Sequence, residues 1–193
     1  MPTWPDDIAS LDAAYEAIDR DARVLVAGLS EALGTWRAAP GTWTVAECLD
    51  HLATSNRVYL EAMRPAAERA AAEGRGRRGP ARPGLFGGWF ARSLEPPARP
   101  LFKTKAPRKI APRASPPLGD AATAFLASHD DVRAFLRQFA TIDLAGVTFP
   151  NPFVGGIRFS LATGLHVLAS HARRHLWQAW NVRRAAEQSA GVN

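Results

Sequence analysis

Four long segments of the chain carry apolar residues at alternating three- and four-residue steps, the spacing of a helix that buries one stripe of its surface. The first segment spans residues 6–33, and its stripe is formed by Ile8, Leu11, Tyr15, Ile18, Ala22, Leu25 and Leu29. Similar spacing predicts helices over about 45–72, 118–139 and 160–187. We find no convincing strand pattern and no internal repeat. The sequence therefore predicts an all-α fold, an antiparallel up-and-down four-helix bundle.

Short-range signals mark several helix ends. Asp6 or Asp7 is placed to cap the first helix, and Gly34 is placed to end it. Thr44 is followed three residues later by Glu47, which is the pattern of a capping box. We therefore expect the second helix to begin directly after Thr44.

Proline and glycine mark the interruptions of the helical pattern. Pro65 lies inside the second helix, where we expect a kink or an early end. Residues 143–159 read as a loop. Residues 73–117 hold nine of the 15 prolines and six of the 15 glycines, so they form a long connection between helices two and three. Within it, the apolar stretch 85–94 is suited to a short helix that packs on the bundle, and 101–107 looks extended.

The positive charge of the chain belongs to this connection. Residues 73–117 contain 11 basic and two acidic residues, a net charge of +9, so the remainder carries −3 of the total +6. We expect a solvated, partly mobile basic flap on a single domain that spans residues 1–193. The alternative is a segment that contacts an anionic partner, either nucleic acid or another protein.

The remaining composition fits a folded cytoplasmic protein. The chain has 193 residues, of which 47% are hydrophobic, enough for a substantial core. The N-terminal residues lack the pattern of a signal peptide, and no apolar stretch approaches the roughly 18 residues that span a bilayer. A lone cysteine, Cys48, excludes an internal disulfide. We expect no membrane partner.

Three histidines are candidates for a metal site. His171 and His175 lie four residues apart on the last predicted helix, so their side chains point to the same side. His51 lies at the edge of the apolar stripe of the second helix, and helical bundles build metal sites from facing helices. Three imidazoles leave coordination positions open to water or substrate, as in catalytic sites. They suit zinc, nickel, iron or copper better than magnesium or calcium.

These histidines stand in a wider pattern, formed by Trp43, Thr44, His51 and Leu52 and later by His166, His171, His175, Leu176 and Gln178. The pattern resembles the DinB-like (DinB/YfiT) superfamily over most of the chain outside 73–117. The resemblance implies a four-helix bundle that binds a divalent metal (Zn, Ni, Fe or Mn) through His51, His171 and His175. It also implies a metal-dependent transferase that uses a low-molecular-weight thiol, such as mycothiol, bacillithiol or glutathione, or a hydrolase.

Other chemically active residues have more modest expected roles. His166 points about 140° away from His171, which favours a packing or hydrogen-bonding role. His129 stands beside two aspartates, and we expect it on a solvated face. Cys48 is either a small core residue or a thiol that faces the metal pocket. Glu47 either orients His51 or serves only the capping box. No residue stands out as a catalytic general base.

Two functions therefore stay open at the level of the sequence. The first is a metal-binding protein that acts on a small-molecule substrate through His51, His171 and His175. The second is a non-catalytic interaction module whose basic segment 73–117 contacts a protein or, less favoured, nucleic acid. A homodimer is compatible with both.

Overall fold

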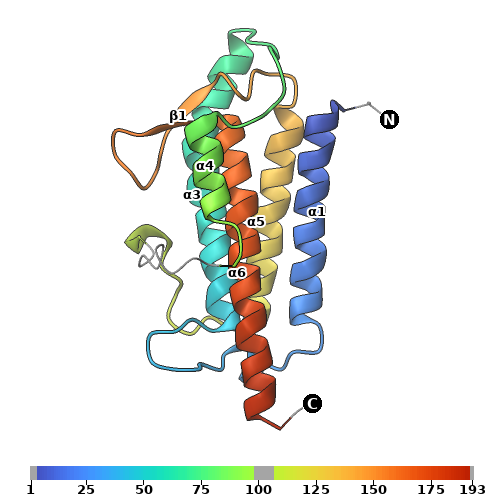
Figure 1. Cartoon of the computed structure of the whole chain (residues 1–193), viewed down its shortest axis with the longest axis vertical. Coiled ribbons are helices and arrows are strands. Elements are labelled where there is room, and N and C mark those ends of the chain that lie inside the picture. Colours follow the sequence, from blue (N-terminus) through green and yellow to red (C-terminus); the bar gives the residue numbers. More distant parts are fainter. Residues whose placement is uncertain (1–3, 98–106, 192–193) are drawn as a thin grey trace.

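The fold is all-α, as expected. The computed structural model describes residues 4–97 and 107–191 (Figure 1). Four long helices lie side by side, and we call them the bundle: α1 (Asp6–Val26), α3 (Val45–Ala72), α5 (Leu118–Gln138) and α6 (Leu161–Ser189). The shorter helices are α2 (Glu31–Gly34), α4 (Leu85–Ser93) and the 3₁₀ turn η2 (Arg108–Ile110).

The predicted apolar stripes face one another in the core of the bundle. Ile8, Tyr15, Phe125 and Phe135 are fully buried. Burying side chains of this size contributes about 1.5–3 kcal/mol each, before the entropy of ordering them is subtracted. The Tyr15 hydroxyl donates to the Leu165 carbonyl at 2.6 Å and so satisfies its polar end inside the core. None of the described helices has the length and apolar character needed to cross a membrane.

The helix directions differ from the expected up-and-down order. Asn56, in the first half of α3, donates to Ser128 at the middle of α5, and Arg64, further along α3, lies at hydrogen-bond distance from Gln138 at the end of α5. The two helices therefore run in the same direction, as the colours of Figure 1 also show. The strictly antiparallel prediction is wrong for this pair.

The long connection between α3 and α5 explains this topology. Helix α3 has 28 residues and is about 42 Å long at 1.5 Å per residue. A short loop would have forced α5 to return antiparallel to α3, but 45 residues (73–117) separate the two helices, and α4 within them lies along α6 (Figure 1). Helix α6 then returns antiparallel to α3 and parallel to α1.

The first helix is shorter than predicted and begins without a side-chain cap. Helix α1 ends at Val26, because Gly28 adopts a left-handed conformation with φ of 67° and turns the chain, and Ser30 then caps α2. The residue before α1 is Pro5, which has no capping side chain, so the prediction of an Asp6 or Asp7 cap is wrong. The Asp7 carboxylate instead binds the connection, as described below.

The start and length of α3 agree with the sequence better. Thr44 and Glu47 form the predicted capping box through both of its hydrogen bonds. The helix continues through Pro65 to Ala72, so the expected early end does not occur.

The loop expected over 143–159 contains a small antiparallel hairpin of β1 (Thr148–Pro150) and β2 (Arg158–Ser160). The aromatic rings of Phe149 and Phe159 are buried there and hold the hairpin to the core.

The described parts of the connection contact the bundle at several points, while most of their basic side chains remain exposed to solvent. The predicted short helix exists as α4, and it packs on α6 so closely that a Cβ added at Gly87 would lie 2.3 Å from Oγ1 of Thr163. Glu95, just after α4, pairs with Arg173 of α6. The expected extended stretch 101–107 lies outside the described residues except for Pro107.

Candidate metal centre

His51, His171 and His175 converge between α3 and α6. One ring nitrogen from each lies within 4.8 Å of the others. The Nε2 atoms of His51 and His171 are 3.1 Å apart, and the His175 ring centroid lies 4.5 Å from that of His51. Because α3 and α6 are antiparallel neighbours, a single His on one helix faces the two stacked histidines of the other. The structure thus brings together the three residues predicted from the sequence.

Hydrogen bonds to the outer nitrogens orient two of the rings. Nδ1 of His51 lies 2.5 Å from the carbonyl oxygen of Ile110 in η2, so this nitrogen donates its proton to the carbonyl. Nδ1 of His175 lies 3.1 Å from Oε1 of Gln178, one turn further along α6. With the protons on Nδ1, both Nε2 atoms present lone pairs, which is the tautomer a metal requires.

All three imidazoles are held in their neutral form. Burial lowers the pKa of His51, partly offset by its bond to Ile110. Burial and the neighbouring His175, His51 and Arg174 lower the pKa of His171 well below its usual value. Burial, together with the neighbouring His51 and the charge of Arg174, lowers the pKa of His175 to about 3. Metal binding therefore needs no proton to leave these rings near neutral pH.

The donor set fits a divalent transition metal. Two imidazoles on one tetrahedral ion at bonds of about 2.0–2.1 Å have nitrogens roughly 3.4 Å apart, close to the 3.1 Å between His51 and His171. Among the described residues the cluster holds no carboxylate, as expected for metals that prefer nitrogen ligands. The indole of Trp43 packs on the same rings, with centroids 4.7 Å from His51 and 5.4 Å from His175.

Residues that the sequence did not single out surround His51. Asp50, the preceding residue, is 2% exposed, and its carboxylate accepts from the backbone N–H of Arg113 at 2.8 Å and from Nε of the same residue at 2.7 Å. Ile110 and Arg113 both belong to the end of the connection. An aspartate directly before a candidate ligand was the one signal in the sequence, because neither Ile110 nor Arg113 belongs to a local pattern that points to His51.

The remaining predictions near the site are resolved by contacts. His166 lies outside the cluster, and its Nε2 is 3.3 Å from the Ala81 carbonyl, so the expected hydrogen-bonding role is confirmed. Cys48 is fully buried and burial raises its pKa, which supports the core role over a reactive thiol. Glu47 uses one oxygen for the Thr44 amide and the other for Arg37, so it serves the cap rather than His51.

The expectation for His129 is wrong. Its side chain is fully buried between the rings of Tyr15 and Phe125, and Nδ1 lies 2.5 Å from the carboxylate of Asp19 on α1. Asp19 also accepts from Arg133 at 3.3 Å. The acidic residues that follow His129 were a poor guide, because successive residues of a helix point about 100° apart. This network joins α1 to α5 and does not include the three clustered histidines.

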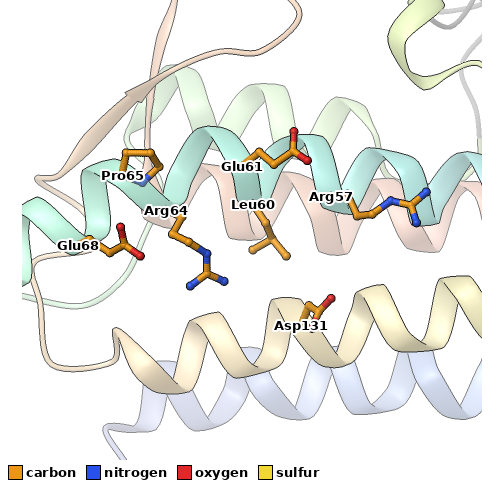
Figure 2. Close-up of a pocket in the computed structure, with 7 residues that line it drawn as sticks. All are labelled: Arg57, Leu60, Glu61, Arg64, Pro65, Glu68 and Asp131. Carbon is orange, nitrogen blue, oxygen red and sulfur yellow. The ribbon is translucent and has the colours of Figure 1, made fainter.

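Two open grooves on the surface lie away from the histidine cluster. One runs between α3 and α5 (Figure 2), lined by Arg57, Leu60, Glu61, Arg64, Pro65, Glu68 and Asp131. A second lies against α1 and is lined by Trp4, Ala9, Asp12, Ala13, Glu16 and Arg137. The alternating charges along α3 are typical of a solvated helix face. Neither groove includes His51, His171 or His175.

We compared the sequence with models of known protein families. A sequence model of the DinB superfamily matches residues 14–179, a range that contains all three histidines and the connection. The chain belongs to the DinB superfamily. No curated protein and no solved structure matches it. Membership in the DinB superfamily and the geometry of the histidine cluster are both compatible with metal binding.

Proposed function

We propose that this DinB-superfamily protein binds a divalent transition metal through His51, His171 and His175. The observation that carries the proposal is the convergence of three neutral imidazoles from α3 and α6, with two Nε2 atoms 3.1 Å apart. We extend the proposal to a metal-dependent reaction, either transfer to a low-molecular-weight thiol or hydrolysis, in the cytoplasm. Zn, Ni, Fe and Mn are the candidate metals.

When bound, such a metal supplies a Lewis acid that lowers the pKa of a bound water or thiol. The chain's own residues prepare the site for this chemistry. Ile110 and Gln178 hold the Nδ1 protons of their histidines, and Trp43 covers two of the rings. Arg174 adds positive charge next to His171 and His175, which favours an anionic ligand.

Metal content is the decisive measurement. The protein is purified without a His tag and without chelator, and its metals are quantified by elemental mass spectrometry. We expect near-stoichiometric metal in the wild type and loss in His51→Ala and in the His171→Ala/His175→Ala variant. His166→Ala is the matched control, because this histidine lies on α6 but outside the cluster. A wild type that stays metal-free after reconstitution would contradict the proposal.

The thiol and hydrolase reactions need a separate assay. We expect metal-loaded protein to consume a low-molecular-weight thiol together with an electrophile, or to hydrolyse an ester or amide. The same activity should be absent from His51→Ala protein at equal concentration. Activity that persists in this variant would separate the reaction from the metal centre.

A second candidate is an interaction module, and one observation favours it. The outer face of α4 exposes Leu85 at 95%, Phe86 at 55% and Trp89 at 52%. Arg82, three residues before Leu85, and Arg92, three residues after Trp89, are also exposed. We infer an acidic protein surface with apolar side chains as the partner, because two copies of this face would bring like charges together. Loss of a salt-sensitive partner complex in Leu85→Ser/Trp89→Ser protein, with metal content unchanged, would separate this role from metal binding.

A further inference from the structure

Two consecutive residues of α3 bind the same short segment of the connection. His51 donates from Nδ1 to the carbonyl of Ile110 at 2.5 Å. Asp50 accepts from the backbone N–H of Arg113 at 2.8 Å and from its Nε at 2.7 Å. The carbonyl that orients the candidate ligand and the residue anchored by Asp50 are thus only three positions apart.

The groups that hold the segment 110–113 to α3 differ in how far they are buried. Asp50 is 2% and Ile110 is 4% exposed, whereas the Arg113 side chain is 61% exposed. The exposed guanidinium adds little to the strength of the ion pair because water screens it. The backbone N–H of Arg113 and the buried carboxylate therefore provide most of the anchor, and removing the carboxylate charge weakens both bonds at once.

We propose that Asp50 and Arg113 are positioning residues of the metal centre. They fix the segment 110–113 so that the Ile110 carbonyl holds the proton of His51 on Nδ1 and leaves Nε2 for the metal. This inference rests on the metal-binding function proposed above. Outer hydrogen bonds of this kind fix the tautomer and ring orientation of ligand histidines, and their loss costs about 10–100-fold in metal affinity.

The chain offers a matched control at the other end of the same connection. Asp7 of α1 accepts from the backbone N–H of Ala81 at 2.6 Å and from the guanidinium of Arg77 at 2.9 Å. The chemistry resembles that of Asp50, because each aspartate binds one backbone amide and one guanidinium, although the Asp7 side chain is more exposed and its two partners are separate residues. None of these three residues belongs to the histidine cluster. Asp7→Asn therefore reports the general cost of loosening the connection.

The test compares zinc affinity, by competition with a chelator, in wild type, Asp50→Asn, Arg113→Ala and Asp7→Asn. We expect Asp50→Asn to bind zinc at least about tenfold more weakly. Arg113→Ala should lose less, because it keeps the backbone N–H. Asp7→Asn should match the wild type. The visible spectrum of the cobalt-loaded protein should change in Asp50→Asn but not in Asp7→Asn, and circular dichroism verifies that each variant is folded.

A second readout requires no metal. Nitrogen NMR of the imidazoles should show His51 protonated on Nδ1 in the metal-free wild type and a mixture of tautomers in Asp50→Asn. Unchanged tautomer, zinc affinity and cobalt spectrum in folded Asp50→Asn would overturn the positioning role while leaving the metal function intact. A wild type that binds no metal would instead remove the proposed function and, with it, this inference.

Discussion

The Nε2 atoms of His51 and His171 lie 3.1 Å apart although 120 residues separate them in the chain. Both rings are kept neutral, because burial lowers both pKa values. With its own proton on Nδ1, His51 accepts at Nε2 the proton that His171 donates from Nε2. A metal bound to both nitrogens would take the place of this proton.

Metal should therefore stabilise the fold. We expect zinc at about 100-fold above its dissociation constant to raise the free energy of unfolding by about 2.7 kcal/mol in the wild type. The His171→Ala/His175→Ala variant should show no increase, while His166→Ala should respond like the wild type. Thermal unfolding with and without zinc measures both. A zinc-dependent shift of equal size in the double variant would place the binding elsewhere.

The lowered pKa of His175 predicts how stability depends on pH. Folding lowers this pKa from 6.5 to about 3, so below about 6.5 the unfolded chain binds a proton that the folded protein does not. The stability of the metal-free protein should fall as the pH decreases through this range, by at most about 1.4 kcal/mol per pH unit for this one group. Denaturant unfolding at a series of pH values tests this. The slope should be smaller in His175→Gln, and an identical slope would contradict the assignment.

The buried pair of His129 and Asp19 should be structural. His129→Ala removes a fully buried ring and one partner of the Asp19 carboxylate, and we expect it to destabilise the fold by about 2–4 kcal/mol. Metal affinity should not change, because the pair lies outside the histidine cluster. Chemical denaturation and zinc titration of the same sample test both points. Weaker zinc binding by a folded His129→Ala protein would show coupling that the contacts do not predict.

Two neighbouring glycines of α4 should respond oppositely to alanine. A Cβ at Gly87 would lie 2.3 Å from Oγ1 and 2.7 Å from Cγ2 of Thr163, so Gly87→Ala should cost about 1–3 kcal/mol by overpacking. At Gly88 the nearest atom is the end of the Arg92 side chain at 3.5 Å. Gly88→Ala should be tolerated and should stabilise by up to about 1 kcal/mol through helix propensity. Thermal unfolding of both variants distinguishes these outcomes, and equal effects would contradict the docking of α4 on α6.

The sequence by itself determined the features that depend on neighbouring residues. The apolar stripes, the capping box of Thr44 and Glu47 and the shared face of His171 and His175 follow from the helical repeat, because residues three or four apart meet on every helix. The third candidate ligand, His51, was suggested by the wider histidine pattern and the family resemblance. Facing helices are required to bring it to the pair, and spacing alone does not show which helices face each other.

Only the tertiary structure decided how distant segments meet. The parallel direction of α3 and α5, the burial of His129 and the anchoring of Arg113 by Asp50 each join residues far apart in the chain. Periodicity says which side of a helix is apolar, but it does not say which helix covers that side or where a long connection returns. Helix direction and long-range contacts are decided by packing and by the pairing of buried charges. The residues that surround His51 could therefore be identified only from the folded chain.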